Sequence, residues 1–348
     1  MKALVLTAHG DTSGLELREL PTPKPVRGEA LVKVEASGVN HMDVLVRRGY
    51  PGIPVTLPHV LGGDVVGTVV DAFPSPPGER ARERGITVGQ RVVAAPVSGC
   101  GDCEVCREGR RFLCAKWQYL GFHRPGGYAE YVCVPAEDLV PLPAHVDAAA
   151  AAALPVAGLT AFHALATVGA LRSGQSLFLW GATGALGSMA VQVAKALGVR
   201  TVVTASTDAK RVLAKQLGAD LVLDPKDAAL VEQVRAFSPG GVDAVFDFIG
   251  AETFPKSFEL AKKGGQLLLC GMIGGREAPL SIHQTYLRHL SIKGLYLGSR
   301  DELARLVDLV AKGAVTPHVG ARLPLADAAE GQRRLERREG EGKLALVL

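Results

Sequence analysis

The chain has 348 residues and a mass of 36.5 kDa, which is enough for about two domains. Apolar residues make up 47% of it and charged residues 21%, and these proportions exclude wholesale disorder. A net charge of +4 and an aromatic content of 5% do not favour a nucleic-acid-binding surface. We therefore expect no nucleic-acid partner.

The most apolar stretch, residues 146–165, is rich in alanine and contains Pro155 and Gly158. We expect it to break into two short helices, one that Asp147 caps and that runs to 154, and one over 160–170, and not to cross a membrane. Residues 1–6 are too short an apolar run for a signal peptide and predict a first strand. These features together predict a soluble, cytoplasmic protein without a membrane partner.

The asparagine content is unusual. Asn40 is the single asparagine of the chain, whereas proline occurs 21 times. Heat-adapted proteins avoid asparagine because its side chain is chemically labile. We hypothesise a thermophilic source, which a melting temperature above about 60 °C would support.

The first 150 residues contain short apolar segments separated by glycine and proline clusters. The segments at 30–34, 65–70 and 91–94 have the composition of β-strands. This half of the chain therefore predicts an all-β, barrel-like module.

Beyond residue 150, strand patterns alternate with helix patterns. Strands are predicted at 176–180, 201–204, 221–223, 244–248, 266–270 and 291–295, and helices at 186–197, 208–217, 228–237 and 254–261. Such alternation is typical of right-handed crossovers onto a parallel sheet. The tail predicts helices at 301–312 and 327–338 and a closing strand at 344–348.

A glycine-rich loop follows the strand at 176–180. Gly181, Gly184 and Gly187 are spaced as G-x-x-G-x-x-G and lead directly into the next helix. In that place glycines permit a tight turn, and backbone N–H groups at a helix N-terminus bind a pyrophosphate. We interpret the loop as a dinucleotide-binding site; the alternative is a tight turn without a ligand.

The choice of cofactor depends on the end of the second strand. NAD-binding sites carry a carboxylate there for the ribose 2′-hydroxyl, but this chain has Ala205, followed by hydroxyl residues and by Lys210 and Arg211. This pattern favours NADP(H) over NAD(H). Asp208 leaves NAD(H) as the alternative cofactor. In a second alternative, Lys210 and Arg211 only form a solvated face of the helix.

Four of the six cysteines lie within 15 residues: Cys100, Cys103, Cys106 and Cys114. Four thiolates at this spacing can complete a tetrahedral zinc shell, with an iron–sulfur cluster as the alternative, and disulfides are not expected in a cytoplasmic protein. Because no position remains for water, the expected role is one structural zinc ion. Cys133 and Cys270 are expected to be packing residues.

Several motifs together resemble the medium-chain, zinc-type alcohol dehydrogenases and their quinone oxidoreductase relatives. They are GVNHMD (38–43), GGDVVG (62–67), VGQRV (88–92), the cysteine cluster, GGYAEY (126–131), LPVAGLT (154–160), the glycine loop and the closing Gly342 and Lys343. The resemblance covers nearly the whole chain. It implies an α/β protein with a GroES-like β-barrel catalytic domain, formed by 1–154 with 295–348 and carrying a zinc lobe at 96–118. It further implies a Rossmann cofactor domain with a doubly wound parallel sheet at 155–294, and a homodimer or homotetramer, often paired along the Rossmann sheet edge.

The resemblance also implies the roles of individual cofactor-binding residues. The pyrophosphate would bind at the glycine loop, through Gly181, Thr183, Gly184, Ala185 and Leu186, and pair with Lys343. Ser206 and Lys210 would hold the adenosine phosphate. Bordering the nicotinamide half would be Gly250, Met272, Ile273 and Leu297.

The chain departs from the zinc alcohol dehydrogenases at the catalytic metal. Those enzymes have a cysteine where Asn40 stands, a His-Glu pair where Gly63 and Asp64 stand, and a cysteine where Val156 stands. A catalytic zinc ion needs three protein ligands and an open position. The sequence therefore predicts that the structural zinc is kept and the catalytic zinc is lost.

Asparagine at position 40 is similar to the quinone oxidoreductase pattern, in which its amide lies near the nicotinamide. We expect Asn40 and His41 to donate to the substrate oxygen, Thr160 to line the site and Asp43 to position its neighbours. Two alternatives remain. Asn40 could adopt a left-handed turn, or His41 and Asp43 could form a non-standard zinc site together with His59 and Asp64.

The main functional hypothesis is an NAD(P)(H)-dependent oxidoreductase that transfers a hydride to or from a quinone, an enone or a carbonyl/alcohol substrate without catalytic zinc. The first alternative is a zinc-dependent alcohol dehydrogenase with a non-standard catalytic site. The second is a non-catalytic nucleotide-binding protein.

Overall fold

The computed structural model describes residues 1–50, 54–73 and 86–348. The chain divides into two compact units, one formed by Met1–Leu159 with Gly298–Leu348 and the other by Thr160–Leu297. From the sequence, these boundaries were expected after residue 154 and before residue 295.

The first unit is built on a seven-stranded sheet with the strand order β10-β6-β5-β3-β18-β17, in which β9 also pairs with β3. The long strand β3 is central: its alternate residues Ala30, Val32 and Val34 lie in a buried cluster with residues of the neighbouring strands. The bounds are β3 (Glu29–Gly38), β5 (Val66–Ala72), β6 (Arg91–Ala94), β9 (Tyr131–Pro135), β10 (Leu139–Pro141), β17 (Val319–Pro324) and β18 (Lys343–Val347). The barrel-like β module predicted for this half of the chain is confirmed.

The C-terminal strand completes this sheet. β18 pairs antiparallel with β3 and parallel with β17, so that Ala345 lies opposite Gly38. Residues from both ends of the chain therefore meet at Gly38, next to the start of α1 (His41–Arg48). The unit also contains β1 (Lys2–Leu6), β2 (Leu15–Glu19), β4 (His59–Val60), β7 (Val97–Ser98), β8 (Gln118–Tyr119), α2 (Glu104–Arg107), α3 (Ala148–Ala151), α10 (Arg300–Ala311) and α11 (Ala328–Glu336).

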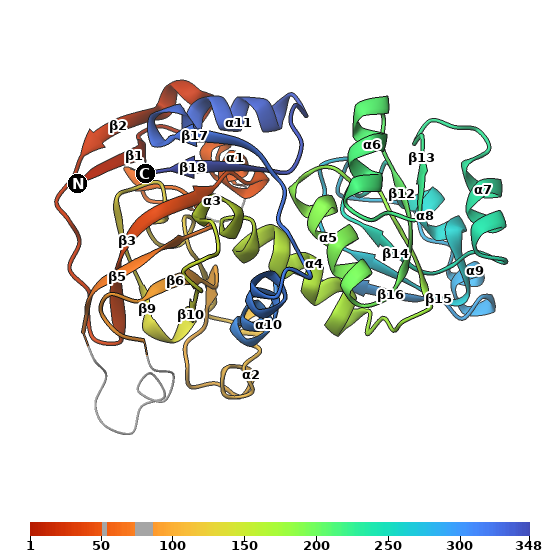
Figure 1. Cartoon of the computed structure of the whole chain (residues 1–348), viewed down its shortest axis with the longest axis horizontal. Coiled ribbons are helices and arrows are strands. Elements are labelled where there is room, and N and C mark those ends of the chain that lie inside the picture. The colour runs from red at the N-terminus through yellow and green to blue at the C-terminus, as the bar shows by residue number, and fades with distance from the viewer. Residues whose placement is uncertain (51–53, 74–85) are drawn as a thin grey trace. The chain divides into compact units, whose positions relative to one another are not determined.

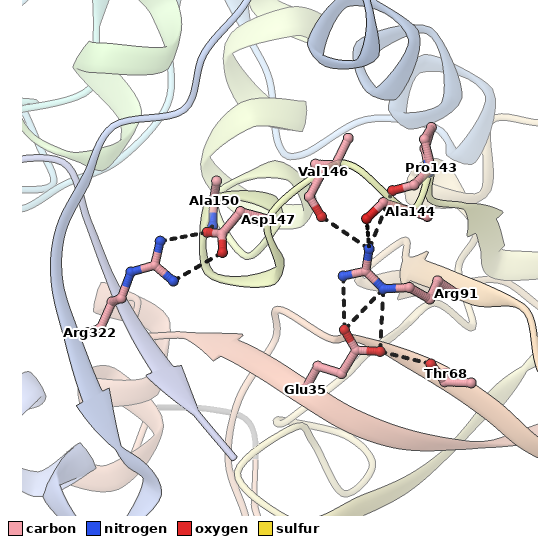
Figure 2. Close-up of polar contacts among 9 residues, drawn as sticks. All are labelled: Glu35, Thr68, Arg91, Pro143, Ala144, Val146, Asp147, Ala150 and Arg322. Atoms are coloured by element: carbon pink, nitrogen blue, oxygen red, sulfur yellow. Dashed lines mark hydrogen bonds and ion pairs between the residues drawn. The ribbon is translucent and has the colours of Figure 1, made fainter.

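A partly buried arginine attaches the segment before α3 to the sheet (Figure 2). Arg91 on β6 donates from Nη2 to Glu35 of β3 at 2.8 Å. Its Nη1 donates to three backbone carbonyl oxygens at 3.1–3.3 Å, those of Pro143, Ala144 and Val146. One guanidinium thus supplies hydrogen-bond donors to the carbonyl oxygens of a turn that lies outside the sheet and helix hydrogen-bond ladders.

The same segment ends at the predicted helix cap. Asp147 accepts from the backbone N–H of Ala150 at 2.9 Å, which confirms its expected role at the start of α3. Arg322 of β17 donates to both carboxylate oxygens of Asp147, as Figure 2 shows. This pairing lowers the pKa of Asp147.

The prediction that the alanine-rich stretch breaks into two short helices is wrong. A 21-residue helix runs from Ala148 to Val168, and Pro155 lies at the start of a π-helical segment within it (Leu154–Gly158). Proline is tolerated at that place because the first N–H groups of a helical segment need no intrahelical acceptor. The helix is long and apolar enough to cross a membrane by length and composition, but 83% of its apolar window is buried inside the protein. This burial is typical of a core helix.

The second unit contains a six-stranded, fully parallel sheet with the strand order β13-β12-β11-β14-β15-β16. This order is that of the doubly wound dinucleotide-binding fold, so the predicted Rossmann architecture is confirmed. Helices flank the sheet, with α5 and α8 on opposite sides in Figure 1. The elements are α4 (Leu159–Phe162), β11 (Ser176–Leu179), α5 (Ala185–Ala196), β12 (Arg200–Thr204), α6 (Asp208–Gln216), β13 (Leu221–Leu223), α7 (Leu230–Phe237), β14 (Val242–Asp247), α8 (Phe254–Leu260), β15 (Ala261–Leu269), α9 (Ile282–Leu287) and β16 (Ser291–Gly294).

Candidate functional site

The glycine loop lies where the sequence places it, between β11 and α5. Gly184 is the N-cap of α5 and is exposed. The buried Thr204 at the end of β12 shapes the turn, because Gly181 N–H donates to its hydroxyl and Ala182 N–H to its carbonyl, both at 3.0 Å. The first N–H groups of α5 therefore lie at an exposed helix N-terminus. Such free N–H donors at the positive end of a helix dipole bind a pyrophosphate.

The remaining residues expected to bind the cofactor in this unit lie at the same edge of the sheet. Parallel strands all end at that edge, and ligands of doubly wound sheets bind there. The residues follow four different strands: Ser206 after β12, Gly250 after β14, Met272 and Ile273 after β15, and Leu297 after β16. The structure thus brings together segments that are up to 116 positions apart in the sequence.

A buried carboxylate that the sequence analysis missed holds the Gly250 turn. Asp247, 1% exposed, accepts from the backbone N–H groups of Ile249 and Gly250 at 3.0 Å. It also accepts from the hydroxyls of Thr253 and Ser257. An acidic residue that ends an apolar strand three positions before a glycine was the available signal.

The adenosine end of this edge has balanced charges. Ser206 is exposed and Lys210 is half-exposed in the first turn of α6. Arg211 forms ion pairs with Asp208 at 2.6 Å and Asp224 at 3.4 Å. Among the described residues, Lys210 is therefore the cation of this group that forms no ion pair.

The four cysteines of the lobe form a group with metal-binding geometry. Their Sγ atoms all lie within 4.8 Å of one another, and no other such group of histidine, cysteine or acidic residues occurs in the described parts of the chain. Backbone hydrogen bonds from Cys103 and Asp102 lower the pKa of Cys100 to about 6. Burial raises the pKa of Cys106 to about 12. Four thiols at these separations fit a tetrahedral Zn²⁺ ion with no position left for water.

Asn40 is bonded within the protein. Its Nδ2 donates to Asp64 Oδ2 at 2.7 Å and, more weakly, to the Gly38 carbonyl at 3.4 Å, while its Oδ1 accepts from the Lys343 ammonium at 2.7 Å. Both N–H bonds of the amide are therefore committed to protein acceptors. The left-handed alternative is wrong, because the φ angle of Asn40 is −128°.

Lys343 lies in the first unit, with its ammonium 2.5 Å from Asp64 Oδ2 and no exposed surface. The resemblance implied a pyrophosphate partner for this lysine, but the structure directs the ammonium inward, toward Asp64 and Asn40. Asp64 Oδ1 in turn accepts from the Val156 backbone N–H at 2.9 Å.

Asp43 connects the start of α1 to the segment that carries Asp64. Its carboxylate accepts from Asn40 N–H at 2.8 Å, from the Tyr128 hydroxyl at 3.0 Å and from Gly62 N–H at 3.2 Å. Burial raises the pKa of Asp43 to about 7, although the hydrogen bond from Asn40 acts in the opposite direction. Tyr128 belongs to the GGYAEY motif, but nothing in the sequence connected it to Asp43.

His41 begins α1 and is exposed. Desolvation by its surroundings, and then the charges of Lys343 and Arg338, lower its pKa. These surroundings favour the neutral imidazole over its charged form. Thr160 lies in α4 of the second unit and is buried.

The residues at the expected catalytic-metal positions do not fit a metal ion. A Cβ atom at residue 63 would lie 2.5 Å from the Tyr119 hydroxyl, so that a ligand side chain has no room there. Val156 offers no ligand atom. Asn40 Oδ1 and Asp64 Oδ2 both bind the Lys343 ammonium and are therefore not free for a metal ion. The alternative set of His41, Asp43, His59 and Asp64 is not among the metal-binding groups of the described residues.

Comparison with known proteins agrees with this architecture. Residues 26–144 match the family described as "Alcohol dehydrogenase GroES-like domain", and residues 185–312 match "Zinc-binding dehydrogenase". An alcohol dehydrogenase of Geobacillus stearothermophilus is 33% identical over 350 residues, covering 100% of this chain and 99% of the relative.

Two solved structures cover 100% of this chain, which in turn covers 100% of each. One is an NAD-dependent alcohol dehydrogenase with a TM-score of 0.93 and 36% identity. The other is a mycobacterial quinone oxidoreductase with a TM-score of 0.82 and 33% identity. The chain is therefore a member of the medium-chain dehydrogenase/reductase superfamily and an oxidoreductase of its alcohol dehydrogenase-like group.

Proposed function

We propose that this protein transfers a hydride between NAD(P)(H) and a quinone, an enone or a carbonyl/alcohol substrate without a catalytic metal ion. The observation that carries the proposal is the buried cluster of Asn40, Asp64 and Lys343. It occupies the place expected for catalytic zinc and commits the oxygen atoms there to an ammonium group. When bound, the nicotinamide cofactor supplies the hydride chemistry.

We assign three further roles to the residues at the start of α1. His41 is exposed at the start of α1, and its surroundings favour the neutral imidazole, so it is the candidate that donates to the substrate oxygen. Asn40 is a positioning residue, since both of its N–H bonds are already used. Asp43 fixes the backbone at Asn40 and Gly62. Thr160 stays a proposed lining residue.

We favour NADP(H) over NAD(H). The end of β12 carries the buried Ala205 in place of the carboxylate that would bind the ribose 2′-hydroxyl, and Lys210 lies in the first turn of α6. Asp208 and Asp224 neutralise Arg211, so the preference depends on Ser206 and Lys210. Relatives described as NAD-dependent make NAD(H) the competing assignment.

A specific observation supports a second candidate, the oxidation of alcohols. Curated relatives of the chain are alcohol dehydrogenases, and one matching structure is a thermostable alcohol dehydrogenase of Pyrobaculum aerophilum with cobalt and zinc bound. Under this candidate the protein would need a second metal ion besides the one in the cysteine lobe.

One experiment separates the two candidates. Zinc per chain is measured on protein purified without chelator, and NADPH and NADH oxidation is measured with quinones, enones and aldehydes. We expect about one zinc per chain and turnover that survives chelator. About two zinc ions, with alcohol-dependent reduction of NAD(P)⁺ that chelator abolishes, would contradict the proposal. Tight NADPH binding without any turnover would indicate a nucleotide-binding protein.

We further propose a cytoplasmic homodimer or homotetramer, with α9 and the edge strand β16 at an interface. Leu280, Ile282, Tyr286 and Leu287 are 47–75% exposed and lie together next to β16. Exposed apolar groups of this size favour a protein partner, and an open sheet edge can pair with a second copy. In the reducing cytoplasm, clustered thiols stay free of disulfides and can bind a metal ion, as the cysteine group of this chain would.

A further inference from the structure

Lys343 is among the most deeply buried charged groups of the described chain. Its side chain has no exposed surface, and its Nζ lies 2.7 Å from Asn40 Oδ1 and 2.5 Å from Asp64 Oδ2. Removing an ammonium group from water costs several kcal/mol unless oxygen atoms replace the water. Both oxygen atoms belong to residues that are far from Lys343 in the sequence. The fold therefore forms a specific enclosure for one cation.

The sequence leaves room for this cation at one particular position. A Cβ atom on Gly38 would lie 2.0 Å from Lys343 Cε and 2.4 Å from Asp64 Oδ2. Any larger residue at 38 would therefore expel the lysine side chain. The glycine of the GVNHMD motif is thus part of the enclosure, although its φ angle is not in the left-handed region.

The hydrogen bonds around Asp64 show what the enclosure holds in place. Asp64 Oδ2 accepts from both Lys343 and Asn40, and Oδ1 accepts from the Val156 backbone N–H. The ammonium therefore links β18, the start of α1 and the helical segment at Leu154–Gly158 through a single carboxylate. Asp64 and Lys343 compensate each other's charge, so removal of either one leaves an unpaired buried ion.

We propose that Asn40 and Asp64 form a cation-binding site whose resident cation is the protein's own Lys343, and that this ammonium is the positioning group that fixes the Asn40 amide beside His41. The first statement concerns the site alone. The second rests on the proposed hydride transfer, because it predicts an effect on turnover. If the proposal is right, an external ammonium ion binds once the lysine side chain has been removed.

The first experiment uses Lys343→Ala in the zinc-containing full-length protein, with n-propylammonium as the probe. We expect propylammonium to raise the melting temperature of the variant by several degrees and to leave the wild type unchanged. Tetramethylammonium at equal ionic strength has no N–H donor and is expected to do nothing. Lys293→Ala is the matched control, because Lys293 donates to the neutral oxygens of Val168 and Gln266.

An equal response of Lys343→Ala and Lys293→Ala, or an equal response to both cations, would overturn the cation site. The second experiment remains informative if Lys343→Ala does not fold. It uses Lys343→Met, which leaves Asp64 unpaired, and Lys343→Met/Asp64→Asn, which removes both charges. We expect the double variant to recover most of the melting temperature lost by the single one.

The positioning role is read from the kinetics of the double variant. We expect its kcat for hydride transfer to fall at least tenfold while the KM for the nicotinamide nucleotide stays within threefold. Restored stability together with wild-type kcat would mean that the pair is structural only, and would refute positioning. If the wild type transfers no hydride to any acceptor, the proposed function fails, but the propylammonium experiment still decides the cation site.

Discussion

Replacing Arg91 by methionine tests how the segment before α3 is held. Arg91 makes charged hydrogen bonds to Glu35 and donates to the carbonyl oxygens of three residues of the 143–146 turn. Its side chain is 22% exposed and that of Glu35 is 33% exposed. Methionine keeps much of the aliphatic volume but removes every donor.

The expected loss follows from these contacts. Hydrogen bonds to charged groups contribute about 1.5–3 kcal/mol each. The contributions are not additive, and water can reach part of Glu35 and the Ala144 carbonyl, whose bond to Arg91 is exposed. Thr68 also continues to donate to Glu35. We therefore expect Arg91→Met to lower the free energy of unfolding by about 2–4 kcal/mol.

Arg322→Met is the matched control, because it removes an arginine bound to the other end of the same segment. The Arg322 and Asp147 side chains are 54% and 47% exposed, and exposed pairs contribute about 0–1 kcal/mol. Asp147 would still cap α3 through Ala150. The loss in this variant is also expected to shrink at high salt, since salt screens exposed charges more than buried ones.

The assay is denaturant unfolding followed by far-UV circular dichroism, with tryptophan fluorescence as a second probe of the two units. We expect the midpoint to shift clearly for Arg91→Met and hardly at all for Arg322→Met. Equal losses, or a larger loss for Arg322→Met, would refute the argument that burial of the donor decides the energy.

Four further outcomes are expected. Because the folded-state pKa of Asp43 is about 7 and its ordinary value 3.8, the folded protein keeps a proton that the unfolded chain loses in this interval. The free energy of unfolding should therefore fall as pH rises from 3.8 to about 7. Asp43→Asn should flatten this slope relative to the wild type, in which the buried Asp138 titrates in the same interval; an unchanged slope in urea titrations would contradict the assignment. Cys106→Ser should lose bound zinc and lower the melting temperature, as measured by elemental analysis and calorimetry, whereas retention of one full equivalent would contradict the four-thiolate site. Lys210→Asp should raise the KM for NADPH relative to NADH by roughly tenfold or more, and an unchanged ratio would remove Lys210 from the phosphate site. Tyr286→Glu should reduce the oligomer measured by light scattering, and an unaltered mass would exclude α9 from the interface.

Local sequence patterns determined most of the architecture. The six strands of the parallel sheet were predicted from apolar runs between glycine-rich turns, and β13 was placed at its observed bounds. Burial on both faces requires such continuous apolar runs, so the signal is contained in a few adjacent residues. The helices α1 and α9, of eight and six residues, were not predicted, because each is shorter than the window of about 11–18 residues over which helical periodicity is assessed. The strand β17 was not predicted either.

The helix around Pro155 shows where local rules failed. Proline and glycine predicted a break, but the tertiary structure keeps a continuous helix by changing to π-helical hydrogen bonding, as in the bond from Gly158 N–H to the Ala153 carbonyl. Most of its apolar surface is buried. Burial of that surface outweighs the local preference of two residues.

For the candidate site, the sequence by itself determined the glycine loop and the cysteine group, whose members lie close together in the chain. Only the tertiary structure decided what surrounds Asn40, because Asp64 and Lys343 are brought to it from positions 24 and 303 residues away in the sequence. The sequence around a lysine near the C-terminus does not indicate whether its side chain is exposed to solvent or buried, as Lys343 is. Pairing of β18 with β3 brings Lys343 into the first unit's sheet beside Gly38, and Asp64 then compensates its charge; no local pattern encodes these contacts.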